Sequence, residues 1–208
     1  MITHIIWDYN GTVVDDVDTA VAAVNAMLKK RGLPPTNKET YKDTLVMPLE
    51  KYYSTVGILN ADIPTLSVEF REESENNSHL SKIFEGVFEV VSFAKNKGIT
   101  NILMSSLYCK YLDLEVEKYG IRKYFDFIMG MKDTSVGSKY NMAYEYIGKN
   151  SIDPENVLFI GDLVSDAQTA KKIGGKCILI PNGHNSKKRC ENEGVTVCEN
   201  LFEITKYL

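Results

Sequence analysis

The chain of 208 residues is 44% hydrophobic and 25% charged, which is the balance of a protein that folds around a buried core. Its net charge of −4 at pH 7 predicts no nucleic-acid partner, because surfaces that bind polyanions are basic. No apolar stretch approaches the length of a membrane span, and the N-terminus lacks the pattern of a secretory signal peptide. We therefore expect a cytoplasmic protein with no membrane association.

The first predicted element is a buried strand over residues 2–7, which ends abruptly at the polar sequence DYNGT (8–12). Similar short apolar runs follow at 99–104, 127–129, 157–160 and 177–180, each bounded by Gly, Asn, Asp or Pro. Strands without polar alternation are buried on both faces, which is typical of parallel sheets.

Residues 15–80 break this rhythm and contain no convincing strand. Asp15, Asp16 and Asp18 can cap and charge a helix start, after which apolar residues recur at helical spacing until Gly32. Two prolines, at positions 48 and 64, can each begin a further helix. Residues 64–78 are polar and acidic, which predicts a helix that is solvent-facing or poorly ordered.

Further helices are predicted over 84–97, 107–119, 138–149 and 165–173, between the later strands. Strands that alternate with helices indicate a doubly wound α/β fold with a parallel sheet. The expected organisation is an α/β core of residues 1–14 and 82–208, with a small α-helical cap of residues 15–81 inserted after the first strand. Hinges are expected near 14–16 and 80–83.

Polar clusters follow three of the predicted strands: Asp8 to Thr12, Ser105-Ser106, and the stretch GDLVSD, which contains Asp162 and Asp166. Ligands of open α/β sheets bind beyond the carboxyl ends of the strands, so these clusters are expected to meet. Lys139 begins the helix before the fourth strand. Carboxylates, hydroxyls and an ammonium group together can hold a hard cation and a phosphoryl group.

These stretches, in this order, resemble the four motifs of the haloacid dehalogenase (HAD) superfamily, especially its phosphoglycolate phosphatase-like members. DYNGT, ILMSS (102–106), Lys139 and GDLVSD (161–166) carry the resemblance, which covers nearly the whole chain. It implies a Rossmann-like core, Mg²⁺ as cofactor, and hydrolysis of a small phosphorylated metabolite through an aspartyl-phosphate.

The resemblance also implies roles for individual residues. Asp8 would be the nucleophile and a metal ligand, together with the backbone carbonyl of Asn10. Asp162 and Asp166 would complete the metal site, and Ser105 and Lys139 would bind the phosphoryl group. The remaining predicted substrate-binding residues are Gly11, whose backbone can approach a phosphate closely, Thr12 and Ser106.

Asn10 departs from the family pattern, because phosphatase members usually have aspartic acid at this position. The implied task of that acid is to protonate the leaving alcohol and then activate water, and an amide does neither. Positioned acid-base groups contribute roughly 10²–10⁴-fold. Asn10 can be natural, in a weak phosphatase, in a hydrolase with other chemistry, or in a catalytically inactive protein that binds a phosphorylated metabolite. It can also be an engineered substitution, or deamidate before Gly11.

Simpler interpretations stand beside these roles. The two serines, Asp162 and Asp166 can each cap a helix, and Lys139 can be solvated, with Lys132 as a rival. His184 follows the last predicted strand and can reach the site, although a loop histidine is the favoured interpretation. Three cap residues can contact substrate or simply pack: Met47, Tyr52 and Tyr53. The sequence indicates no oligomeric state.

Overall fold

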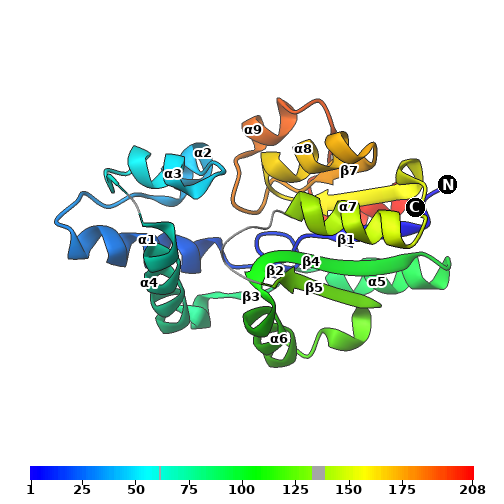
Figure 1. Ribbon diagram of the computed structural model, residues 1–208, viewed down its shortest axis with the longest axis horizontal. Helices are drawn as coiled ribbons and strands as arrows, with labels where there is room; N and C mark the ends of the chain where they lie inside the picture. The colour runs from blue at the N-terminus through cyan, green and yellow to red at the C-terminus, as the bar shows by residue number, and fades with distance from the viewer. Residues whose placement is uncertain (61, 133–138) are drawn as a thin grey trace.

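A six-stranded parallel sheet with strand order β5-β4-β1-β6-β7-β8 forms the centre of the molecule. The computed structural model describes residues 1–60, 62–132 and 139–208, and helices cover both faces of the sheet (Figure 1). The strands are β1 (His4–Trp7), β4 (Thr100–Tyr108), β5 (Phe127–Met131), β6 (Val157–Gly161), β7 (Lys176–Leu179) and β8 (Thr196–Val197). The predicted doubly wound α/β fold is confirmed.

Alternating side chains of the strands build one apolar core on each face of the sheet. On β1, Ile5 and Trp7 belong to the first core and Ile6 to the second. The first core is closed by α5 (Val87–Asn96), α6 (Cys109–Lys118) and the C-terminal 3₁₀ helix η4 (Leu201–Tyr207). The second core is closed by α7 (Lys139–Lys149), α8 (Val164–Ile173) and α9 (Lys187–Glu191). Burial on both faces explains why the strand sequences lack polar alternation.

The largest correction to the predicted elements concerns β4, which continues to Tyr108. Ser105 and Ser106 therefore lie within the strand rather than after it, and the helix predicted from residue 107 begins only at Cys109. Pairing with β5 resumes at Tyr108 after an irregularity in register that begins at Met104, and this pairing extends the strand. The predictions also missed the short edge strand β8 and helix α9.

Four helices lie between the short strands β2 (Val14–Asp15) and β3 (Lys82–Ile83), which pair antiparallel. They are α1 (Val17–Lys30), α2 (Lys38–Thr44), α3 (Leu49–Thr55) and α4 (Ile63–Asn76), and they stand to one side of the sheet (Figure 1). Pro48 precedes α3 and a proline lies in the first turn of α4, as predicted. Helix α2 was not predicted. These helices share an apolar cluster of their own, to which Tyr52 and Tyr53 contribute buried rings.

Three further 3₁₀ turns complete the connections: η1 (Ser78–Leu80), η2 (Arg122–Tyr124) and η3 (Pro154–Asn156). None of the helices in the described part of the chain combines the length and the apolarity that crossing a membrane requires.

A buried polar contact joins the neighbouring strands β1 and β4. The Oδ1 of Asn101 on β4 accepts a hydrogen bond from Nε1 of Trp7 on β1 at 2.9 Å, and its Nδ2 donates to the Ile99 carbonyl at 3.0 Å. Neither Trp7 nor Asn101 is exposed. The indole N–H of Trp7 therefore depends on Asn101, because water cannot replace a partner at this depth.

We expect Asn101→Leu to lower the free energy of unfolding by about 1–3 kcal/mol, because it leaves the Trp7 N–H buried without an acceptor. Urea denaturation followed by fluorescence measures the change, since Trp7 is the only tryptophan. The control introduces Asn101→Leu into a Trp7→Phe background, in which the indole donor is absent. Urea denaturation followed by circular dichroism should then show a smaller loss in the free energy of unfolding. An unchanged urea midpoint in the single variant would contradict this account.

Candidate active site

The parallel register places the ends of β1 and β6 at the same edge of the sheet. Trp7 pairs with Ile160 as the last residue of β1, and the Asp8 N–H donates to the Ile160 carbonyl at 2.8 Å. Asp162 follows directly after Gly161, the last residue of β6. The sequence stretches that begin at Asp8 and Asp162 are therefore neighbours in space. Thr12 of the first stretch contacts the Asp162 carboxylate, although the two residues are 150 positions apart in the chain.

Three carboxylates gather at this edge: Asp8, Asp162 and Asp166. One oxygen of each lies within 4.8 Å of the others, and the residues are 8%, 0% and 3% exposed, respectively. Asp166 comes from the first turn of α8, where its Oδ2 accepts the Leu163 N–H at 3.1 Å. Asp166 thus helps to cap α8 with Oδ2, as predicted, while its Oδ1 faces the cluster.

Burial raises the pKa of Asp8 well above its ordinary value, and repulsion by Asp166 and Asp162 adds to this effect. Burial likewise raises the pKa of Asp162 to about 6, with a further contribution from Asp166. Placing three carboxylates together away from water therefore costs free energy, which a neighbouring positive charge reduces.

Lys139 supplies such a charge from the start of α7. Its Nζ lies 2.5 Å from Asp8 Oδ1 and 2.6 Å from Asp166 Oδ1. Burial alone would lower the pKa of Lys139, but the attraction of Asp166 and Asp8 outweighs it and raises that pKa above the ordinary value. The rival Lys132 is exposed. Gly137 and Ser138, which precede Lys139 in the sequence motif, lie outside the described residues.

The turn after β1 brings backbone close to the carboxylates. Gly11 has φ +74°, and a Cβ at this position would lie 2.3 Å from Asp162 Oδ2, so both its backbone conformation and its surroundings require glycine. The buried Thr12 donates from Oγ1 to Asp162 Oδ1 at 3.1 Å. Thr12 therefore orients a carboxylate in the structure, in addition to any contact with substrate.

The side chain of Asn10 is held by Asp16. Its Nδ2 donates to Asp16 Oδ2 at 2.7 Å, while the Gly11 N–H donates to Asp16 Oδ1 at 2.9 Å. Asp16 occupies the N-cap position of α1, but its side chain makes no capping hydrogen bond there. The predicted capping role of the Asp16 side chain is therefore wrong, because its carboxylate faces back toward the turn after β1.

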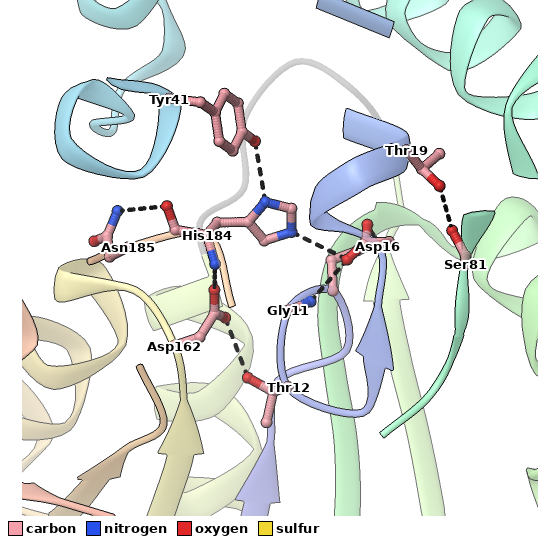
Figure 2. Close-up of polar contacts among 10 residues, drawn as sticks. Gly11, Thr12, Asp16, Thr19, Tyr41, Ser81, Asp162, His184 and Asn185 are labelled. Atoms are coloured by element: carbon pink, nitrogen blue, oxygen red, sulfur yellow. Dashed lines mark hydrogen bonds and ion pairs between the residues drawn. The ribbon is translucent and has the colours of Figure 1, made fainter. Parts of the chain in front are cut away.

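His184 lies in a loop, as favoured from the sequence, but it is a buried residue of this site. It is 6% exposed, and its ring joins Asp16 through Nε2 at 3.1 Å and Tyr41 through Nδ1 at 3.0 Å (Figure 2). Its backbone N–H donates to Asp162 Oδ2 at 2.5 Å. Burial alone would lower the pKa of His184, but the attraction of Asp16 outweighs it and raises the pKa to about 9.

Ser105 and Ser106 differ in their surroundings. Ser105 is buried on β4, next to β1, and its Oγ accepts the Leu107 N–H at 3.1 Å. Ser106 is exposed. Among the described residues, neither serine forms a hydrogen bond or ion pair with the carboxylates, so their predicted roles in substrate binding rest on their place at this edge of the sheet.

The donor set fits a hard divalent cation. Carboxylate oxygens are preferred ligands of Mg²⁺, and Asp8, Asp162 and Asp166 converge on one small volume. A cation there would relieve the repulsion and the desolvation that raise the pKa values of Asp8 and Asp162. Lys139 is paired with Asp8 and Asp166. Protonated His184 attracts Asp162 but is itself paired with Asp16.

Sequence reasoning missed two residues of this arrangement, Asp16 and Tyr41. It did note that His184 follows the last predicted strand, where ligands of such sheets bind, but it ranked contact with the site below a plain loop role. Tyr41 carried no such signal, because its contact depends on how α2 lies against the core.

Comparison with known proteins supports the fold and the family. The family described as haloacid dehalogenase-like hydrolase matches residues 5–180. A phosphoglycolate phosphatase of Pseudomonas aeruginosa is 24% identical over 96% of this chain and 77% of that protein. An N-acetylmuramic acid 6-phosphate phosphatase of the same organism is 23% identical over 86% of this chain and 82% of that protein.

Solved structures show the same architecture. A haloacid dehalogenase-like family protein of Streptococcus pneumoniae superposes with a TM-score of 0.85 at 19% identity. The alignment covers 99% of this chain and 98% of that one, so the likeness includes the helices between β2 and β3.

The pKa of His184 provides a test of the site's electrostatics. Because a folded-state pKa of about 9 exceeds the ordinary 6.5, protonated His184 stabilises the fold fully below about pH 6.5, and this contribution is lost as the pH rises through about 9. In the metal-free protein, Asp16→Asn should lower the pKa of His184, because it removes the negative charge that opposes the effect of burial.

An NMR titration of the histidine ring signals measures this pKa, with His184→Gln to assign the resonance. Asp18→Asn is the matched control, because Asp18 is an exposed aspartate two residues away that pairs with Lys38. Equal His184 pKa values in the wild type and in Asp16→Asn would refute the assigned role of Asp16.

Proposed function

The chain belongs to the haloacid dehalogenase-like hydrolase family, and from that premise we propose that it is a Mg²⁺-dependent phosphatase acting on a small phosphorylated metabolite. The ion pair of Lys139 with Asp8, set inside the buried carboxylate cluster at the strand ends, carries this proposal. It joins a nucleophile to a group that binds phosphoryl oxygens, as the family's chemistry requires. The relatives named as phosphatases support the same class of reaction.

Asp8 is the proposed nucleophile. One of its carboxylate oxygens forms a bond to phosphorus while the bond from phosphorus to the leaving oxygen breaks, which yields an aspartyl-phosphate and an alkoxide that takes up a proton. Water then attacks phosphorus and loses a proton, and inorganic phosphate leaves as the Asp8 carboxylate is restored. Lys139, next to Asp8, holds phosphoryl oxygens and stabilises the charge that develops on them.

The proposed Mg²⁺ ligands are Asp8, Asp162, Asp166 and the backbone carbonyl of Asn10. Bound there, the cation would offset the repulsion between the nucleophile and the phosphate. The chain's own contribution is to orient these ligands. Thr12 and the His184 N–H hold the two oxygens of Asp162, and the Leu163 N–H holds Asp166.

Asn10 limits which substrates react quickly. Its amide has no proton to exchange near neutral pH, and its Nδ2 is committed to Asp16. Alkyl phosphates need a proton on the leaving oxygen, whereas aryl and acyl phosphates depart unaided. We therefore infer that activated phosphates are turned over faster than alkyl phosphates.

The residues between β2 and β3 are proposed to act as the cap of this site, with boundaries near residues 15 and 81. A cleft lies between Leu45, Val46 and Met47 on the cap side and the start of α8 on the core side, and Gln168 and Arg189 add polar groups to it. We propose that this cleft receives the part of the substrate beyond its phosphate. Tyr52 and Tyr53 instead pack in the cap's own apolar cluster.

Replacing the nucleophile tests the reaction directly. We expect Asp8→Ala to reduce Mg²⁺-dependent phosphate release from p-nitrophenyl phosphate by about 10³-fold or more, because no covalent intermediate can form. The exposed-site variant Asp18→Asn should retain the wild-type rate. Equal release by the wild type and Asp8→Ala would show that Asp8 is not the nucleophile.

Exchanging the amide and the carboxylate tests the role of Asn10. Asn10→Asp alone sets two carboxylates against each other, because the Asn10 side chain lies 2.7 Å from Asp16 Oδ2. In Asn10→Asp/Asp16→Asn, the hydrogen bond survives with its donor and acceptor reversed. We expect this double variant to hydrolyse glycerol phosphate roughly 10²-fold faster or more, with little gain on the aryl phosphate.

Steady-state rates on both substrates measure the effect. No gain on glycerol phosphate would mean that position 10 has another role, and equal gains on both substrates would exclude proton supply as the cause. The competing function, a protein that binds a phosphorylated metabolite without turning it over, is favoured by the amide at position 10. This binding function would replace our proposal if neither the wild type nor the double variant released phosphate, while calorimetry showed that both proteins bind inorganic phosphate.

A further inference from the structure

One loop of the core, residues 181–186 between β7 and α9, contacts both the cap helix α2 and the carboxylate cluster. We propose that Tyr41, His184 and Asn185 are positioning residues that couple the seating of α2 on this loop to the geometry of the metal site. The proposal rests on the function proposed above, since it requires that the cluster bind Mg²⁺. It adds residues that act on the proposed metal ligands through hydrogen bonds and are not ligands themselves.

The first half of the coupling is the set of contacts that holds the C-terminal end of α2 against the core, which we call the seat of α2. Helix C-termini leave backbone carbonyls without partners inside the helix. Here the Lys42 carbonyl accepts from the Ser186 N–H at 3.3 Å and from Arg189 Nη1 at 3.2 Å, and the Leu45 carbonyl accepts from Asn185 Nδ2 at 3.2 Å and also from Arg189. The end of α2 is therefore capped by the core.

Side chains of α2 make the reverse contacts. Lys42 Nζ donates to the Pro181 carbonyl at 2.9 Å, and the Tyr41 hydroxyl meets His184 Nδ1 at 3.0 Å in a buried contact. The rings of Tyr41 and His184 also meet edge to face, with centroids 5.8 Å apart. Polar and aromatic contacts thus tie α2 and the loop together in both directions.

The second half of the coupling joins the same loop to the metal-site residues (Figure 2). The His184 N–H donates to Asp162 Oδ2 at 2.5 Å, and Asn185 Oδ1 accepts the Val164 N–H at 3.0 Å in the first turn of α8, which also carries Asp166. The ring of His184 reaches Asp16, which holds Asn10 and the turn after β1.

His184 and Asn185 each contact α2 or its C-cap on one side and the metal-site residues on the other. If α2 leaves the loop, both residues lose the contacts that orient them toward the site. Coupling of this kind is reciprocal. Seating of α2 strengthens metal binding, and metal binding holds α2 in its seat by the same factor.

The test uses the full chain, with Mg²⁺ as the only ligand. Tyr41→Phe keeps the buried ring and removes the hydroxyl that meets His184. We expect isothermal calorimetry to show Mg²⁺ binding weakened about fivefold or more. Hydrogen exchange at the α2 amides should slow on addition of Mg²⁺ in the wild type, and slow less in the variant.

Tyr52→Phe is the matched control. Tyr52 packs edge to face on Tyr41 in the same apolar cluster, and its buried hydroxyl has no hydrogen-bond partner among the described residues. Mg²⁺ affinity should be unchanged in this variant. A second seat variant, Lys42→Met, removes the contact with Pro181 from a half-buried position and should weaken Mg²⁺ binding as Tyr41→Phe does.

The outcomes separate this inference from the proposed function. The coupling would be overturned, and the phosphatase proposal left intact, if both Tyr41→Phe and Lys42→Met showed wild-type Mg²⁺ affinity and wild-type hydrogen exchange at the α2 amides. Failure of the wild-type protein to bind Mg²⁺ would overturn both. A kcat lowered by Tyr41→Phe at subsaturating Mg²⁺ and restored at saturating Mg²⁺ would support weakened metal binding as the cause.

Discussion

The mutual repulsion of three buried carboxylates is the constraint on which the rest of this structure depends. Asp8, Asp162 and Asp166 meet where water is largely excluded, and Lys139 is the cation that pairs with two of them. Such a cluster costs free energy unless each oxygen has a partner. The apolar cores on both faces of the sheet, together with the hydrogen bonds of the strands, supply the stability that makes this arrangement possible.

Most oxygens of the cluster are assigned to a donor of the chain. Asp162 is held by Thr12 and by the backbone of His184, and Asp166 is held by the backbone of Leu163. These donors come from four parts of the chain: the turn after β1, the loop after β6, the start of α7 and the loop after β7. The carboxylate cluster is therefore also a point at which four separate parts of the chain are joined by hydrogen bonds and ion pairs.

Asn10 and Asp16 form a hydrogen-bonded pair beside the proposed nucleophile. An amide two residues after the proposed nucleophile removes one ionisable group, and Asp16 supplies a carboxylate 2.7 Å away, which accepts the amide and also faces His184. The pair keeps a hydrogen bond where two carboxylates would repel. The chemistry at this position therefore depends on both residues, and a description of Asn10 alone is incomplete.

The amino-acid sequence by itself determined the α/β fold and the positions of Asp8, Asp162 and Asp166, because strand periodicity and the polar residues after each strand are local patterns. Lys139 was chosen through the resemblance to the haloacid dehalogenase superfamily. Only the tertiary structure decided the extension of β4 beyond Ser105, the orientation of Asp16 away from its helix, and the burial of His184 beneath Tyr41. Each of these depends on a contact between segments far apart in the chain. Periodicity and propensity describe neighbours along the sequence, whereas such contacts depend on how separate elements of the chain pack against one another.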